Sequence, residues 1–285
     1  MRLVSLLPAA TEILLALGLE EELVGITHRC EVPATGEEPA VLTRTGSGGG
    51  DALDAPALVE TDPDLVIVGP GDDGSIGARL VDAAFADVTV RPSVLTIAPA
   101  SVEGVLNAIA AVGAMTEAED DALAVVEGLR ERLKALEDIV IGRRDGGFRP
   151  PRLVVLDPAD PPVMLGRWVP DQVRLAGGWE LLAQDGARPE PTTWDSVRDV
   201  DPELLVLVPD GLPLPEAVRA WEAAPRPEGW AELRAVREDR VFVVDGGALL
   251  LAGPRVVDGI EILAELIDPS AFDGMAPTAS WARAR

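Results

Sequence analysis

The feature that most constrains the fold is a short pattern that occurs twice, 139 positions apart. Asp62-Pro63-Asp64 precedes the apolar run 65–68, and Asp201-Pro202-Glu203 precedes the apolar run 204–207. Proline disfavours a helical conformation in the residue before it, and a run that is apolar at every position is typical of a strand covered on both faces. Two such units, one in each half of the chain, predict two similar α/β lobes. A cleft between two lobes is a common place for a ligand.

The charge of the chain argues against two classes of partner. A net charge of −25 and a pI near 4.3 disfavour nucleic acid and anionic membranes. Arginine makes up 23 of the 24 basic residues, because Lys134 is the only lysine. Such an acidic, lysine-poor composition is expected either from adaptation to high salt or from GC-rich coding, and both explanations stay open.

The chain has one cysteine and one histidine, and these low counts exclude disulfides and several kinds of metal site. Cys30 is the only cysteine, so the chain forms no intramolecular disulfide and no thiolate metal cluster. His28 is the only histidine, which excludes a multi-histidine metal site within one chain. Tyrosine is absent, so six tryptophans carry most of the aromatic surface. We therefore expect no resident metal and no cofactor.

The first residues are apolar, but they do not read as a signal peptide. Glu12 interrupts the apolar stretch, and Glu20–Glu22 lie where a small-residue cleavage site would be expected. We expect the folded domain to begin at residue 1, and no segment is long and apolar enough to span a membrane. The chain as written is then cytoplasmic, or extracytoplasmic if a native leader or anchor lies outside it.

The chain alternates between strand and helix patterns. In the first half we expect strands at 3–7, 23–27, 65–68 and 88–90, helices at 11–17, 77–85 and 101–115, and a flexible loop at 44–51. In the second half we expect strands at 153–156, 204–208 and 240–244, and helices at 169–176, 214–223 and 254–267. The longest helical pattern runs from Thr116 to about Ile141 and begins with a capping box formed by Thr116 and Glu119. Residues from Asp268 onward are small and polar, which predicts a loosely held end.

These elements predict an α/β protein of two mostly parallel-sheet lobes, bridged by one long helix, with a ligand cleft between the lobes. The expected parts are an N-terminal lobe at 1–115, a bridging helix at 116–141, a C-terminal lobe at 142–268 and a tail at 269–285.

This order of elements, together with several local strings, resembles the cobalamin-type (helical-backbone, class III) substrate-binding proteins of ABC importers. The matching strings include Val4-Ser5-Leu6-Leu7-Pro8, Gly166-Arg167-Trp168-Val169-Pro170, Leu175-Ala176-Gly177-Gly178 and Gly253-Pro254-Arg255. Others lie at 23–33, 63–67, 194–195, 202–206, 229–233, 240–246 and 256–259, so that the resemblance covers nearly the whole chain in order. It implies a non-enzymatic, monomeric binding protein that carries a corrinoid as its ligand for ABC-type uptake. Relatives of this fold also carry iron-siderophores or haem, which is the alternative.

His28 and Arg29 follow the expected strand at 23–27, at a junction where α/β lobes commonly place ligand contacts. Either side chain could donate hydrogen bonds to a polar ligand. The alternative is that His28 is a loop residue satisfied within the protein, and that Cys30 is a small buried hydrophobe.

Trp168 and Trp194 lie in loops of the second half, where indole faces could grip a large flat ligand such as a corrin. Trp179, Trp221 and Trp230 follow or lie within helical patterns, and we expect them to serve packing.

Asp245 ends a strand and Arg255 follows a Gly-Pro turn. Asp245 could accept hydrogen bonds from ligand amides, and Arg255 could meet phosphate or carboxylate. The alternatives are a turn residue and a surface ion pair.

Residues 69–74 match the glycine fingerprint of dinucleotide-binding enzymes, which leaves a nucleotide-binding α/β enzyme as a second class of function. Asp72 and Asp73 would place two negative charges against a pyrophosphate, so we expect the match to be coincidental.

The resemblance also implies docking onto ABC transporter membrane subunits through one carboxylate on each lobe. Asp195 matches the position on the second lobe. At the first-lobe position the chain has Ser75, with Asp72 and Asp73 nearby.

Overall fold

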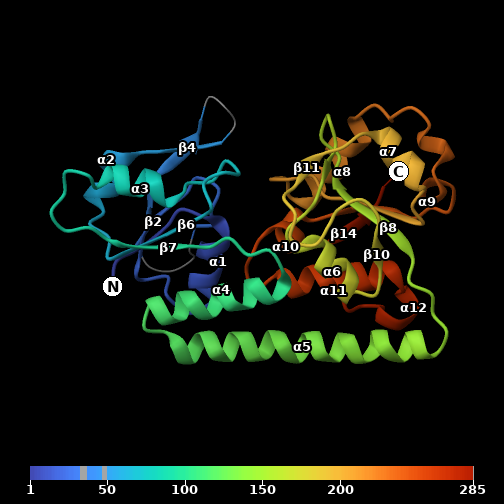
Figure 1. Cartoon of the computed structure of the whole chain (residues 1–285), viewed down its shortest axis with the longest axis horizontal. Helices are drawn as coiled ribbons and strands as arrows, with labels where there is room; N and C mark the ends of the chain where they lie inside the picture. The colour runs from blue at the N-terminus through green and yellow to red at the C-terminus, as the bar shows by residue number, and fades with distance from the viewer. Residues whose placement is uncertain (33–36, 47–49, 285) are drawn as a thin grey trace. The chain divides into compact units, whose positions relative to one another are not determined.

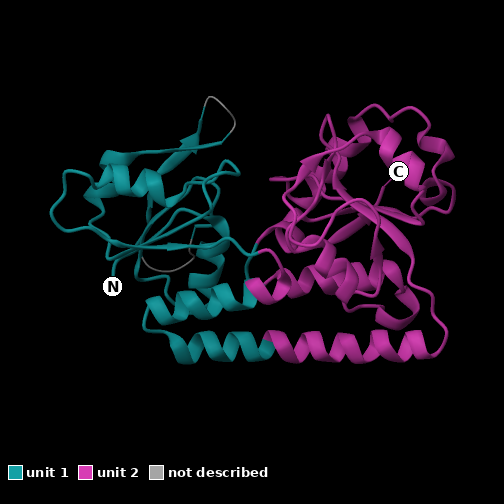
Figure 2. Ribbon diagram, viewed as in Figure 1, with its two compact units in different colours: residues 1–99, 105–128, 252–254 teal, residues 100–104, 129–251, 255–285 magenta. Residues whose placement is uncertain are grey.

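The computed structural model describes residues 1–32, 37–46 and 50–284, and the chain divides into two compact units. Unit 1 comprises residues 1–99, 105–128 and 252–254, and unit 2 comprises residues 100–104, 129–251 and 255–285 (Figures 1 and 2). Helices α4 (Val102–Met115) and α5 (Glu119–Asp145) contribute residues to both units. In the part of the chain that the structure describes, no helix has the length and apolarity needed to cross a membrane.

Unit 1 is built on a five-stranded sheet in the order β3-β2-β1-β6-β7, and all its pairings are parallel. Its strands are β1 (Leu3–Ser5), β2 (Leu23–Ile26), β3 (Ala40–Val41), β6 (Leu65–Val68) and β7 (Ser93–Thr96). β1 and β6 are buried along their whole length, as expected for a parallel sheet with both faces covered. The predicted α/β class is therefore confirmed in this unit.

Short helices and one hairpin complete unit 1. The helices are α1 (Pro8–Ala16), α2 (Ala55–Glu60) and α3 (Ala78–Ala84). The hairpin joins β4 (Thr43–Thr45) to β5 (Asp51–Leu53). We expected a flexible loop at 44–51, but both of its ends lie in these strands, and residues 47–49 lie outside the described residues.

Unit 2 has a larger mixed sheet in the order β11-β9-β8-β12-β13-β14, with β10 paired to β8. Its strands are β8 (Arg152–Asp157), β9 (Val163–Met164), β10 (Trp179–Glu180), β11 (Glu190–Pro191), β12 (Leu204–Leu207), β13 (Val241–Val244) and β14 (Trp281–Arg283). The central strands β8, β12 and β13 are parallel, and the pairs that involve β9, β11 and β14 are antiparallel. The centre of the sheet therefore has the same parallel arrangement as unit 1.

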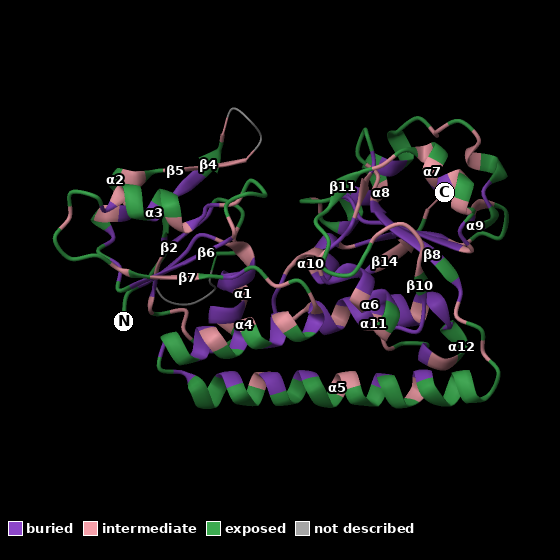
Figure 3. Ribbon diagram, in the orientation of Figure 1, coloured by how far each residue is buried: buried purple, intermediate pink, exposed green. Residues whose placement is uncertain are grey.

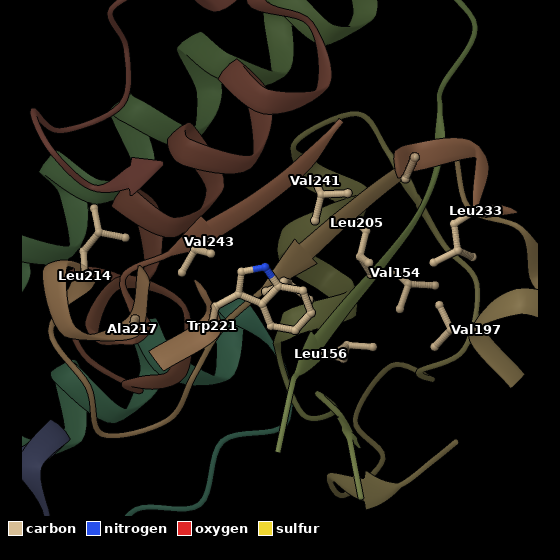
Figure 4. Packing of buried hydrophobic residues seen from close by; sticks show 12 residues of the cluster. Val154, Leu156, Val197, Leu205, Leu214, Ala217, Trp221, Leu233, Val241 and Val243 are labelled. Carbon is tan, nitrogen blue, oxygen red and sulfur yellow. The ribbon is translucent and has the colours of Figure 1, made fainter. Parts of the chain in front are cut away.

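Helices pack on this sheet around an apolar core. They are α6 (Val169–Leu175), α7 (Trp194–Val200), α8 (Leu214–Ala223), the 3-10 helix η1 (Trp230–Glu232), α9 (Arg234–Arg237), α10 (Gly246–Leu250), α11 (Val256–Ile267) and α12 (Pro269–Phe272). Figure 4 shows Trp221 of α8 among branched side chains of β8, β12 and β13, including Leu156, Leu205 and Val243. Large side chains from one helix thus cover one face of the parallel strands.

The repeated pattern has the same structure in both units. Asp62 and Asp201 adopt left-handed backbone conformations, with φ of 45° and 41°, directly before their prolines. The acid that follows each proline accepts a hydrogen bond from a backbone N–H at the start of the neighbouring strand: Arg2 N to Asp64 Oδ2 at 2.7 Å, and Arg152 N to Glu203 Oε2 at 2.8 Å.

The two arginines complete this arrangement. The Arg2 guanidinium donates to Thr61 O at the end of α2, and the Arg152 guanidinium donates to Val200 O at the end of α7. Each copy therefore ties the end of a helix to the start of two adjacent strands, which explains why the pattern marks equivalent strands.

Helix α5 buries one side only. Its buried residues recur at helical spacing, and the rest of its surface is mostly exposed (Figure 3). They are Ala122, Val126, Leu129, Leu136 and Val140. Within unit 2, Arg132 of α5 forms ion pairs of 2.6 Å with both Asp258 and Glu261 of α11. These two carboxylates raise the pKa of the Arg132 guanidinium, so this part of α5 is tied to α11 by charge as well as by apolar contact.

Several predicted boundaries are wrong, for identifiable reasons. Residues 88–90 form no strand, because Val88 N donates to Phe85 O in a turn that follows α3, and the strand beside β6 begins at Ser93. Thr116 does not cap α5; its hydroxyl donates to Val112 O of the preceding helix at 2.9 Å. As a result α5 begins at Glu119 and continues to Asp145, beyond Ile141.

The expectation of a loosely held end is also wrong. Residues 269–272 form α12, and β14 pairs antiparallel with β13. The Trp281 ring packs edge-on against Phe242 with ring centroids 5.4 Å apart, and Trp281 Nε1 donates to Glu265.

Candidate functional site

The carboxyl ends of parallel strands are where α/β lobes usually hold ligands, and in unit 2 three acids follow three neighbouring strands. Asp157 ends β8, Asp210 follows β12 and Asp245 follows β13. Burial raises the pKa of the Asp157 carboxyl, and Asp210 nearby raises it further. The carboxyl edge of unit 2 is therefore acidic.

Asp245 and Arg255 meet at the start of α10. The Asp245 carboxylate caps this helix, because Oδ1 accepts a hydrogen bond from Gly247 N at 3.0 Å. A Cβ atom placed on Gly247 would lie 3.0 Å from Arg255 Nη1 and 3.4 Å from Asp245 Oδ1. Because Gly247 has no side chain, the Asp245 carboxylate and the Arg255 guanidinium both lie close to it. We call Asp245, Gly247 and Arg255 the Asp–Arg cradle.

Two side chains of the α6 region hold the segment that carries this cradle. Trp168 is 7% exposed, and its Nε1 donates to Leu249 O at 2.8 Å. Gln172, which is fully buried, donates from Nε2 to Val256 O at 2.9 Å. In unit 2 the Trp168 indole therefore packs and binds backbone; the idea that it offers a face to a ligand stays a prediction.

Trp194 lies elsewhere in unit 2, in a cluster with Trp221 and Trp230. Its ring centroid is 6.3 Å from that of Trp221 and 5.7 Å from that of Trp230. Trp221 and Trp230 pack against the core, as predicted, and the structure does not bring Trp194 together with Trp168. Trp179 does not serve packing as predicted, because it lies on strand β10 and is 67% exposed.

In unit 1, His28 and Arg29 follow β2 and bind the β4–β5 hairpin. The two ring nitrogens of His28 lie 2.8 Å and 3.2 Å from the hydroxyls of Thr43 and Thr45. Arg29 Nε forms an ion pair of 3.2 Å with Asp51. His28 and Arg29 are exposed, so they remain candidates for ligand contact as well as for hairpin anchoring.

Cys30 belongs to a small polar network at the carboxyl ends of β1 and β2. Its sulfur lies 2.9 Å from Thr11 Oγ1 and 3.1 Å from Thr27 Oγ1, and Thr11 also contacts the Ser5 hydroxyl at 2.8 Å. Ser5, Thr11 and Thr27 are buried. Cys30 therefore sits among hydroxyl groups and is not packed as a simple hydrophobe.

The 69–74 loop lacks the geometry of a dinucleotide site. In that motif the last glycine opens a helix at the phosphates, whereas here α3 begins at Ala78, with Gly77 as its N-cap. The Asp73 carboxylate accepts hydrogen bonds from the backbone N–H and the hydroxyl of Ser75, and the Ser75 hydroxyl accepts one from Gly71 N. The loop thus closes on itself.

The two candidate docking positions are both on the surface. Asp195 lies in the first turn of α7, its side chain is 76% exposed, and it pairs with Arg198 at 2.6 Å. On unit 1, Ser75 is half-buried and carries no charge; Asp72 and Asp73 beside it are exposed. Across residues 1–32, 37–46 and 50–284, no group of three His, Cys, Asp or Glu side chains is arranged to hold a metal.

Sequence reasoning named Asp245 and Arg255 as candidates and did not consider Gln172 and Gly247, which the structure places beside them. Gln172 occupies a core position of an otherwise apolar helix face, and a polar residue at such a position was the available signal. The glycine pair directly after Asp245 was the signal for the cradle.

Comparison with known proteins gives a consistent result over most of the chain. An ABC transporter substrate-binding lipoprotein of Bacillus subtilis, YvrC, described as uncharacterized, is 25% identical over 280 residues, which cover 95% of this chain and 81% of the relative. A vitamin B12-binding protein of Vibrio cholerae is 23% identical over 264 residues, covering 91% of this chain and 86% of the relative. A periplasmic heme-binding protein of Pseudomonas aeruginosa shares the fold, with a TM-score of 0.75 and 21% identity over 95% of this chain and 93% of its own.

The model of the periplasmic binding protein family matches residues 3–247. That match includes the repeated strands of both units and the first part of the Asp–Arg cradle. As the resemblance predicted, the chain belongs to the periplasmic binding protein family.

Proposed function

We propose that this protein is a non-enzymatic corrinoid-binding protein of an ABC-type uptake system. The observation that carries the proposal is the Asp–Arg cradle, in which a carboxylate and a guanidinium lie side by side close to Gly247. An acceptor next to a donor complements a carboxamide, which has one oxygen to accept a hydrogen bond and N–H groups to donate. The edge of a corrin carries several carboxamides.

The acidic side chains at the carboxyl ends of the unit 2 strands favour a ligand with neutral polar groups over a ligand with anionic groups. Asp157, Asp210 and Asp245 follow neighbouring strands there, and like charges close together repel. The propionates of haem and the carboxylates or catecholates of many siderophores would meet this repulsion. A carboxamide would not.

The relatives support the same ligand class and a transport role. One is described as a vitamin B12-binding protein and another as an ABC transporter substrate-binding lipoprotein, which favours a place outside the cytoplasmic membrane. In this proposal Trp168 and Trp194 of unit 2 supply apolar surface, and Asp195 docks on the membrane subunits. His28 and Arg29 of unit 1 are separate candidates for polar contact. The protein acts as a monomer and needs no cofactor.

Equilibrium dialysis against cyanocobalamin tests the proposal, at both 0.1 M and 2 M NaCl because of the acidic composition. We expect saturable binding, together with a rise in melting temperature that grows with ligand concentration. Haemin and a ferric siderophore serve as parallel ligands. Absence of cyanocobalamin binding at both salt concentrations overturns the proposal, and binding of haemin or the siderophore instead supports the alternative ligands.

Two variants test the cradle itself. Arg255→Met and Asp245→Ala each remove one partner of the carboxamide, and each should weaken binding by about 5- to 30-fold, as expected for about 1 to 2 kcal/mol. Arg130→Met is the matched control, because Arg130 forms an exposed ion pair with Glu103. Unchanged affinity in both cradle variants removes the cradle from the site.

A further inference from the structure

We propose that Gln172 is a positioning residue, which holds the Asp–Arg cradle in the geometry that binds ligand. The inference rests on the proposed function, since the cradle is the ligand contact that Gln172 would position. Gln172 itself is fully buried and therefore acts through the segment that carries the cradle.

The contacts of Gln172 are placed where they control Arg255. Gln172 Nε2 donates to Val256 O, one residue after Arg255, and Trp168 Nε1 donates to Leu249 O at the other end of the same segment. The two side chains lie about one turn apart in sequence and bind both ends of the segment 249–256. Gln172 thereby holds the backbone next to Arg255, whose guanidinium lies close to Gly247.

Gln172 is a costly choice at this position. Its Oε1 is buried and has no hydrogen-bond partner among the residues that the structure describes. A buried acceptor without a partner destabilises a fold, and an apolar side chain of the same size would avoid this. Residues that lower stability without an evident structural gain are expected mainly at functional sites.

Gly259 of α11 leaves room for the Gln172 amide. A Cβ atom on Gly259 of α11 would lie 2.5 Å from Ala248 O and 2.6 Å from Gln172 Nε2. Because Gly259 has no side chain, α11 approaches α10 and the Gln172 amide together. An alanine at 259 would therefore displace the amide, which provides a second way to disturb the same contact.

Gln172→Met separates positioning from stability. Methionine fills a similar volume without the hydrogen bond, so the urea midpoint of unit 2 should stay equal or rise while cyanocobalamin affinity falls about tenfold. Gln184→Met is the matched control, since Gln184 is the only other glutamine and is exposed. Combining Gln172→Met with Arg255→Met should add little to the loss caused by Arg255→Met alone.

Amide hydrogen exchange of the ligand-free protein tests the inference without any ligand. Exchange in residues 249–256 should become at least several-fold faster in Gln172→Met and in Gly259→Ala, and should not change in Gln184→Met. If the wild type binds no cyanocobalamin, the proposed function fails, but exchange still decides whether Gln172 holds this segment. Unchanged exchange in Gln172→Met overturns the inference. A loss of cyanocobalamin affinity that is fully explained by a lower urea midpoint also overturns it.

Discussion

Glu180 should make the stability of unit 2 depend on pH in a defined range. Its carboxylate accepts hydrogen bonds from four backbone N–H groups, those of Val155, Leu181, Leu182 and Ala183, at 3.0 to 3.3 Å. Burial of the charged form outweighs these bonds and raises the pKa of Glu180 from 4.5 to about 7. The folded protein therefore binds this proton more tightly than the unfolded chain does.

The sign and size of the effect follow from proton linkage. A raised carboxyl pKa contributes stability that is fully present below pH 4.5 and is lost as the pH rises through about 7. A pKa of about 7 in place of 4.5 corresponds to about 3 kcal/mol, of which about 2.5 kcal/mol is lost between pH 5 and pH 8. Glu180→Gln cannot titrate and should lack this part of the pH dependence.

Urea unfolding followed by tryptophan fluorescence measures this quantity directly, because all six tryptophans lie in unit 2. The free energy of unfolding of the wild type minus that of Glu180→Gln should fall by about 2.5 kcal/mol from pH 5 to pH 8 at constant salt. Glu190→Gln, at an exposed position on β11, is the control for removal of one carboxylate. A difference between wild type and Glu180→Gln that is constant over this range would refute the reasoning.

Two further predictions follow from the repeated pattern and from the charge. Glu203→Ala should destabilise unit 2 by about 1 to 3 kcal/mol, because Arg152 N loses its acceptor and Arg234 loses an ion pair of 2.6 Å. Asp64→Ala should destabilise unit 1 by about 1 kcal/mol, measured by circular dichroism. If neither variant is destabilised, the shared role of the two acids is contradicted. Raising NaCl from 0.1 M to 1 M should raise the melting temperature, because screening weakens the repulsion within a chain of net charge −25; a flat or falling melting temperature contradicts this.

Local signals were sufficient to predict the elements that proline and apolar runs define. β6, β12 and α8 have their predicted cores because a proline lies just before or at the start of each one. Among the strands that sequence reasoning missed, β10 and β14 are two and three residues long. They form because a partner strand elsewhere in the sequence offers unpaired backbone N–H and C=O groups. The local sequence pattern contains no information about that partner.

The residues of the candidate site also fall into two groups, those with a local sequence signal and those whose contacts depend on distant parts of the chain. The positions of Asp245 and Arg255 could be predicted because each lies at a turn next to an element boundary, and both precede a helix in the structure. The hydrogen bonds of Trp168 and Gln172 could not, since both reach backbone carbonyls about 80 residues later in the chain. His28 was predicted to contact ligand, but its contacts with Thr43 and Thr45 depend on a hairpin that reads as a loop.

The position of β14 has a consequence for how the protein is made. Strand β13 is covered on one side by β12 and on the other by β14, so the sheet of unit 2 is completed only after residue 283 has been synthesised. At a usual translation rate, β8 then waits roughly 10 s for the last strand of its sheet. During that interval unit 2 exposes an unpaired strand edge that chaperones could recognise, whereas the sheet of unit 1 already has all its strands.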